Sequence, residues 1–98
     1  MDTDSEYISK CIDFFDKVVE VKRKKDYDYN SGIINRDMYF LHGVNTGVDE
    51  LYKKILRLIS LTSNDSKPKN ESIEDTLIDI TGYAADLYIY IKKKQKGK

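Results

Sequence analysis

The run from Asn70 to Lys94 constrains the fold of this chain more than any other stretch. It contains no proline. It begins with an asparagine, a good N-terminal cap for a helix, and has Glu71 and Glu74 in the first turn, where the helix dipole favours negative charge. Apolar residues recur along it at helical spacing, namely Ile73, Leu77, Ile80, Ala84, Leu87 and Ile91. The pattern predicts one long helix with an apolar face.

The opposite face of this predicted helix carries acids and one glycine, namely Glu71, Asp75, Asp79, Gly82 and Asp86. Ile78, Ala85 and Ile89 flank that row, so this face is not one that simply meets solvent. Gly82 costs about 1 kcal/mol relative to alanine inside a helix, which suggests that another helix or a ligand comes close there. A helix that is apolar on most sides is usually central to a bundle, and we expect this role for Asn70–Lys94. The acids themselves allow two interpretations, a binding site or a solvated helix face.

A first helix is predicted from Thr3 to about Val21. Thr3 and Glu6 have the spacing of a capping box, and apolar residues follow at helical spacing. The basic run Lys22–Lys25 suits the C-terminal end of that helix and predicts a solvated helix end. The next segment, Asp26–Gly32, is rich in turn formers and predicts a loop.

A second helix is predicted from Thr46 to about Leu61. Residues 33–41 allow either a short helix or an ordered loop, and a break that includes Gly47 follows them. Residues 62–70 hold the only proline and no apolar side chain, so they predict an exposed loop. No run with the period of a strand is present, and the sequence therefore predicts a small all-α bundle.

The composition limits the chain to one small helical domain, residues 1–98, with a basic C-terminal tail at residues 93–98. The 17 basic and 17 acidic residues cancel, so no overall field draws the chain toward nucleic acid or an anionic membrane. A single cysteine and a single histidine argue against an internal disulfide and against a structural zinc site within one chain. With no signal peptide and no long apolar span, we expect a protein of the cytoplasm that does not enter a membrane.

Three pieces of the sequence carry a family resemblance. They are Lys25-Asp26-Tyr27, then Arg57-Leu58, and then Glu71 with the run Asp75-Thr76-Leu77-Ile78-Asp79-Ile80 and Gly82-Tyr83-Ala84, which is the most specific piece. Over about residues 20–92 the chain resembles the nucleotide-modification-associated domain family of phages and bacteria, which is similar to the MazG-type nucleotide pyrophosphohydrolases. The resemblance implies a MazG-like all-α fold, an oligomer, a nucleotide ligand and Mg²⁺, with the host cytoplasm as the compartment of a phage-encoded protein.

The resemblance also implies roles for particular residues. The acids that would hold Mg²⁺ are Glu71, Asp75 and Asp79. Hydrolysis of a nucleoside triphosphate needs a second set of acids on the preceding helix, to complete the metal site and activate water. That helix carries Lys53 and Lys54 where an acid is expected ahead of Arg57. A lysine can neutralise a phosphate but does not position an attacking water, so the departure favours binding over hydrolysis.

The expected function is that of a phage-type protein that binds a nucleotide or a nucleotide signal, as a protein directed against host defence would, without efficient turnover. The expected ligand-binding residues are charged or aromatic, namely Lys25, Asp26, Tyr27, Lys53, Lys54, Arg57 and Tyr83. Of these, Tyr27 and Tyr83 are expected to face the ligand, where they could stack on its base. Two alternatives stay open: a Mg²⁺-dependent nucleoside triphosphate pyrophosphohydrolase, and a structural or protein-inhibiting helical module.

The short chain and its central helix predict a homo-oligomer, most simply a dimer. A chain of this length has little core of its own, and the central helix is apolar on too many sides for a monomer. We expect the interface to bury parts of Ile78, Ala85, Ile89 and the segment 88–90.

Overall fold

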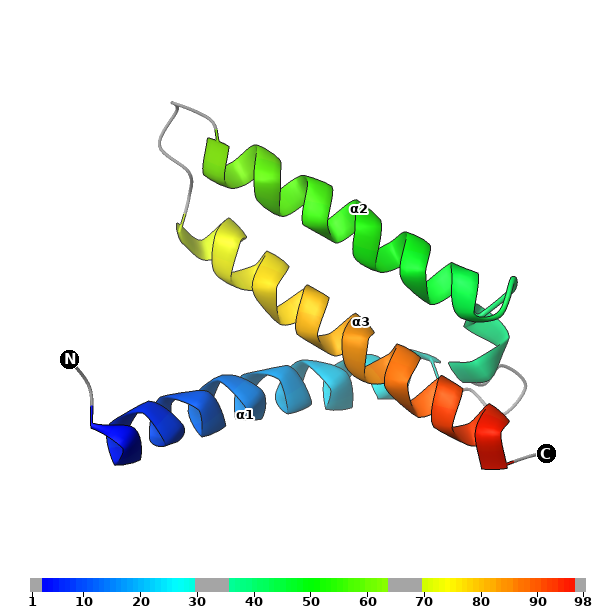
Figure 1. The fold of residues 1–98 in the computed structure, drawn as a ribbon, viewed down its shortest axis with the longest axis horizontal. Coiled ribbons are helices and arrows are strands. Elements are labelled where there is room, and N and C mark those ends of the chain that lie inside the picture. Colours follow the sequence, from blue (N-terminus) through cyan, green and yellow to red (C-terminus); the bar gives the residue numbers. More distant parts are fainter. Residues whose placement is uncertain (1–2, 30–35, 64–69, 97–98) are drawn as a thin grey trace.

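The computed structural model describes residues 3–29, 36–63 and 70–96. Within these ranges the chain forms α1 (Asp4–Tyr29), a single 3-10 turn η1 (Arg36–Tyr39), α2 (Val44–Ser63) and α3 (Asn70–Lys96), as Figure 1 shows. The described residues contain no strand, which confirms the predicted all-α fold class. None of the described helices is both long enough and apolar enough to cross a membrane.

The C-terminal helix α3 is the element to which the other two helices attach. α2 lies antiparallel beside α3, and α1 crosses α3 on another side (Figure 1). The prediction that this helix is central is therefore confirmed. It also explains why α3 is apolar on more than one side, because each neighbouring helix covers a different arc of its surface.

The contact between α2 and α3 depends on a glycine inside α2. A Cβ atom at Gly47 would lie 2.7 Å from Cδ1 of Leu87 and 3.1 Å from Cε1 of Phe40, so a side chain there would hold the two helices apart. The Phe40 ring stacks on the ring of Tyr90, with centroids 4.2 Å apart and planes 10° from parallel. The expectation that Gly47 belongs to a helix break is wrong, because the glycine is needed for close packing and not for a turn.

The helix starts agree with the sequence in one case and differ in another. The backbone N–H of Glu6 donates to Oγ1 of Thr3 over 3.1 Å, so the predicted cap of α1 is confirmed. α2 begins at Val44 and not at Thr46, because Gly43 makes the turn with φ of 67°. The Thr46 hydroxyl accepts a hydrogen bond from the backbone N–H of residue 42 over 2.8 Å. If the helix began at Thr46, this hydroxyl would instead accept from a backbone N–H later in the chain.

The end of α1 is also later than predicted. Residues 26–29 continue the helix to Tyr29, so the loop predicted at Asp26–Gly32 is wrong for these four residues, and residues 30–32 lie outside the described part. Tyrosine and aspartate are only slightly poorer helix formers than lysine, and the segment contains neither glycine nor proline before Gly32. The segment 33–41, for which a short helix or a loop was expected, holds the single turn η1.

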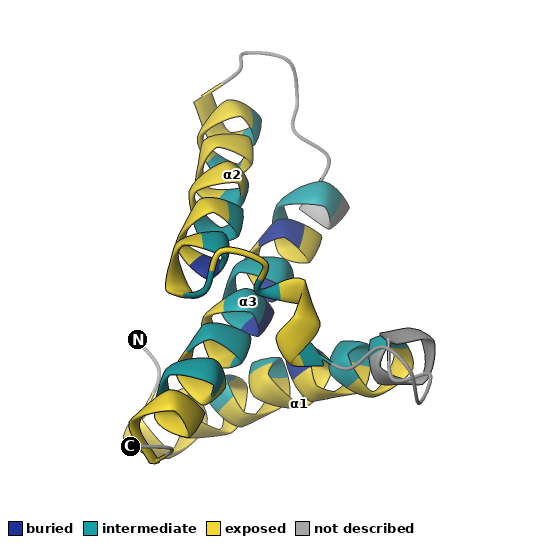
Figure 2. Ribbon diagram, turned by 90° about the vertical axis from the view of Figure 1, so that its right-hand side faces the viewer, coloured by how far each residue is buried: buried dark blue, intermediate teal, exposed yellow. Residues whose placement is uncertain are grey.

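The described chain buries few apolar side chains deeply. Among the apolar side chains of the described residues, only Val18 and Ile78 are 9 % exposed or less, and both line the hollow between α1 and α3. Figure 2 shows how little of the ribbon is coloured as buried. Ile78 is thus covered within one chain, which contradicts its assignment to an oligomer interface. Conversely, Leu77 on the predicted apolar face is 40 % exposed.

Candidate functional site

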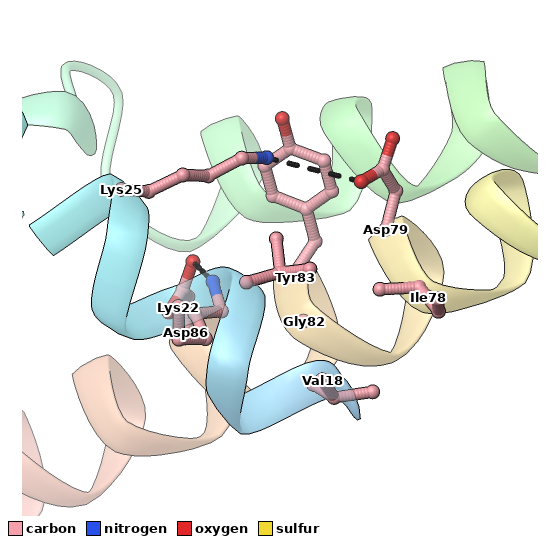
Figure 3. Close-up of a pocket in the computed structure, with 9 residues that line it drawn as sticks. Val18, Lys22, Lys25, Ile78, Asp79, Gly82, Tyr83 and Asp86 are labelled. Atoms are coloured by element: carbon pink, nitrogen blue, oxygen red, sulfur yellow. Dashed lines mark hydrogen bonds and ion pairs between the residues drawn. The ribbon is translucent and has the colours of Figure 1, made fainter. Parts of the chain in front are cut away.

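A hollow lies where α1 crosses α3, and Figure 3 shows the side chains around it. The hollow is shallow, and most of the roughly 340 Å³ of space in it is open to solvent. Val18 and Val21 of α1 and Ile78 of α3 form its apolar floor. Charged and aromatic side chains form the rest of its wall, so the hollow combines an apolar floor with a polar rim.

Gly82 allows the two helices to approach at this hollow. A Cβ atom there would lie 3.0 Å from Cε and 3.4 Å from Nζ of Lys22, whose side chain passes across α3 at this point. The expectation of a close approach at Gly82 is confirmed, and the neighbour is a lysine side chain of α1. The glycine therefore helps to position a positive charge at the rim.

The acids of α3 at this rim face basic side chains. Asp86 pairs with Lys22, and its Oδ1 lies 3.8 Å from Nη1 of Arg36. Asp79 pairs with Lys54 over 3.2 Å and with Lys25 over 3.8 Å. Both carboxylates are only about one quarter exposed. Around Asp79 and Asp86 this side of α3 is therefore a contact face toward other elements, whereas Asp75 on the same row is exposed.

Tyr83 stands at the centre of this group of charges. The Nζ atoms of Lys22, Lys25 and Lys54 lie 5.7, 5.9 and 5.9 Å from the centroid of its ring. Each distance is within the range at which an aromatic ring attracts a cation. The lysines come from two helices and the tyrosine from a third, so only the folded chain brings these groups together.

Basic side chains outnumber acidic ones among the described members of this group. The basic members are Lys22, Lys25, Arg36 and Lys54, and the acidic members are Asp79 and Asp86. We call these six residues, together with Tyr83, the basic cluster. Several ammonium and guanidinium groups gathered on a partly sheltered surface attract anions, phosphates above all.

The structure brings together four of the residues that the sequence predicted for a site, namely Lys25, Lys54, Tyr83 and Asp79. Lys53 points elsewhere, since its side chain is 69 % exposed and pairs with Glu50 over 3.4 Å. Arg57 and Asp75 are exposed and do not line the hollow. Asp26 and Tyr27 lie in the last turns of α1, but their side chains, like that of Glu71, are outside the described part of the structure.

Three members of the basic cluster were not predicted, namely Lys22, Arg36 and Asp86. A signal existed for Asp86, which shares its helix face with Asp79 and Gly82. Lys22 belongs to the basic run that predicted a solvated helix end. That prediction is wrong for Lys22 and Lys25, because α1 continues beyond them and turns both side chains toward α3. The sequence contains no signal that points to Arg36.

The described acids do not resemble a magnesium site. Mg²⁺ is held by several oxygen ligands in an octahedron, and no three His, Cys, Asp or Glu side chains gather among the described residues. The carboxylates of Asp79 and Asp86 face ammonium and guanidinium groups instead. The described side chains therefore do not fit Mg²⁺. The predicted set of Glu71, Asp75 and Asp79 stays a prediction, because the side chain of Glu71 is outside the described part.

Comparison of the chain with models of known families, with curated proteins and with solved structures found no match. The likeness to the nucleotide-modification-associated and MazG-type families therefore remains a resemblance carried by the quoted residues. What the chain does has to be argued from the basic cluster itself.

Proposed function

We propose that this protein binds an anionic nucleotide at the basic cluster and holds it without cleaving it. The observation that carries the proposal is the convergence of three lysine ammonium groups, from α1 and α2, around the ring of Tyr83 on α3. Phosphate oxygens would take the place that the carboxylates of Asp79 and Asp86 now share. The tyrosine ring offers an aromatic surface on which a base can stack.

The chemistry of the cluster favours a nucleotide over a simple anion. The hollow itself is too small to enclose a nucleotide, so the ligand would lie across its rim, over the lysines and Tyr83. Lysines gathered around an aromatic ring suit a phosphorylated ring compound. The resemblance of the run from Asp75 to Ala84 supports the same ligand class.

The groups that the described cluster contains support binding without turnover. Lysines neutralise phosphate charge, but hydrolysis also requires a group that activates and aims a water molecule. The carboxylates of the cluster are engaged with bases, and the described acids do not fit a metal ion that could activate water. A protein of this kind would act by sequestering its nucleotide, as expected of a phage protein directed against a nucleotide signal of host defence.

Titration calorimetry with adenine and guanine mono-, di-, tri- and cyclic nucleotides tests the proposal. In EDTA, wild-type protein should bind at least one of them, and Lys54→Gln should weaken that binding about tenfold, because it removes a charge-assisted contact. Lys53→Gln is the matched control. Its lysine precedes Lys54 but points away from the cluster, so its binding constant should stay within about twofold of wild type. No heat with any of these nucleotides would contradict the proposal.

Asp79→Asn separates direct binding by lysine from binding through a metal ion. In the basic cluster, Asp79 competes with the ligand for Lys25 and Lys54, so the amide should leave binding unchanged or strengthen it by a few-fold, on the order of 1 kcal/mol. Were Asp79 a ligand of Mg²⁺, the same change would weaken binding sharply, and EDTA would abolish it. The bound nucleotide, recovered after denaturation and identified by mass spectrometry, should be intact.

A further inference from the structure

The first half of α1 extends beyond its contact with α3 and exposes apolar side chains. Every residue from 3 to 10 is exposed. Four apolar residues lie along one side of α1 with about half of their surface exposed, namely Ile8, Ile12, Phe15 and Val19. We call these four residues the α1 seam. An isolated stretch of helix this short is marginal in water and normally depends on packing for its stability.

The α1 seam has the spacing of a coiled coil. Its members are separated by steps of four, three and four residues, the alternation that keeps apolar side chains aligned along a partner helix. The seam is distinct from the side of α1 that meets α3, because that contact uses Val18, Val21 and Lys22. α1 therefore has two sides that can pack against another helix, and α3 covers one of them.

The overall dimensions indicate that a large surface lacks a partner. A folded chain of 11.4 kDa is expected to expose about 5,800 Å², whereas this chain exposes 7999 Å². Its radius of gyration is 15.9 Å, whereas about 13 Å is typical of a compact chain of this length. The excess of roughly 2,200 Å² is more than the roughly 800 Å² that each partner buries in an interface of standard size.

The charges along α1 favour a second copy of the same chain in antiparallel orientation. We propose that α1 packs against α1 of a second copy through the α1 seam. A two-fold axis between residues 12 and 15 sets Ile8 opposite Val19 of the second copy, and Ile12 opposite its Phe15. The same axis sets the acidic start of α1, with the exposed Asp4 and Glu6, level with the basic end of α1 of the second copy, with the exposed Arg23 and Lys24, so opposite charges lie together at both ends.

The same charges argue against other arrangements of this helix. A parallel pair would instead set the acidic start of α1, with Asp4 and Glu6, beside the same acids of the second copy. The polar side of α1 carries Asp13, Asp16 and Glu20 together with Lys10 and Lys17, so it presents no excess of positive charge to an anionic membrane. Helices that lie on membranes instead carry lysine and arginine on their polar side.

Light scattering tests the dimer over a series of micromolar concentrations. Wild-type protein should approach twice the chain mass of 11.4 kDa, and Ile12→Glu should raise the dissociation constant of the dimer at least about tenfold, because it places a carboxylate in an apolar seam. Ile59→Glu is the matched control, since Ile59 on α2 is 52 % exposed and Ile12 is 53 % exposed. This control should leave the dimer intact. A monomeric wild type, or equal loss in both variants, would overturn the proposal.

Disulfide trapping tests the antiparallel register without relying on a destabilising variant. In a Cys11→Ser background, tagged Ile8→Cys protein is mixed with untagged Val19→Cys protein and oxidised. The expected product is a cross-link between a tagged and an untagged chain, while Ile8→Cys alone forms none, because only residues that lie opposite each other meet the distance limits of a disulfide. Cross-linking of Ile8→Cys to itself, or none in the mixture, would overturn the antiparallel arrangement. Neither result depends on nucleotide, so this proposal can fail separately from the proposed function.

Discussion

The two contacts that α3 makes differ in their chemistry. Its contact with α2 is mainly apolar, with a glycine at the closest approach and a stacked pair of aromatic rings at one end. Its contact with α1 is shorter and charged. Outside the buried pair Val18 and Ile78, ion pairs line this crossing, among them Lys17 with Glu74 over 2.9 Å.

This difference explains why the candidate site is centred on the crossing of α1 and α3, with Lys54 reaching it from α2. Opening the contact between α2 and α3 to a ligand would expose apolar surface to water, which is unfavourable. Partly exposed ion pairs, by contrast, stabilise a fold by only about 0–1 kcal/mol each, so a ligand anion can replace a carboxylate at small cost. The crossing of α1 and α3 can therefore serve both as a structural contact and as a binding surface.

The largest expected effect comes from the apolar floor of the crossing. Ile78→Ala should lower the free energy of unfolding by about 2–4 kcal/mol, because it opens a cavity beside Val18. Leu77→Ala is the matched control. Its side chain precedes Ile78 but is 40 % exposed, so its loss should be clearly smaller. Urea unfolding followed by circular dichroism, at one protein concentration, measures both. If the two variants lost equal amounts of unfolding free energy, the crossing of α1 and α3 would have no stabilising apolar centre.

A matched pair of glycine substitutions compares the two contacts directly. Gly47→Ala should destabilise the protein by about 1 kcal/mol, because the clash with Leu87 and Phe40 exceeds the gain in helix propensity. Gly82→Ala meets only the flexible end of Lys22, so its stability should match or exceed wild type by up to about 1 kcal/mol. Thermal unfolding of the two variants gives the order. Greater destabilisation by Gly82→Ala would contradict the assignment of the tighter contact to α2.

The smallest expected effect concerns the exposed ion pair at the edge of the crossing. The hydrogen bond from Lys17 to Glu74, together with the charge of that carboxylate, raises the pKa of Lys17 above its ordinary value of 10.5. The stabilisation is therefore fully present below the ordinary pKa and is lost as the pH rises through the higher pKa of the folded state. Lys17→Met should be slightly less stable than wild type at pH 7, and the difference should vanish at strongly alkaline pH. A difference that grew with pH would contradict this sign.

Most of the helices could be predicted because their signals are local. The spacing of apolar residues marks α2 and α3, and the capping residues Thr3 and Glu6 mark the start of α1. The boundaries at Tyr29 and Val44 were missed for a different reason. Turn-forming composition is only a weak preference, so it did not stop α1 before Tyr29, and packing against α3 explains why Gly47 lies inside a helix.

What the sequence by itself determined is the chemistry available on each helix face: an acidic row on α3, with a glycine in it, and lysines on the two other helices. Only the tertiary structure decided which of those groups meet. Helical periodicity sets the face on which a residue lies but not the point at which two helices cross. Lys53 and Lys54 are adjacent in sequence but about 100° apart around α2. Which of the two reaches the basic cluster depends on where the helices cross. The structure turns Lys54 toward Asp79 and Tyr83 and leaves Lys53 in solvent beside Glu50.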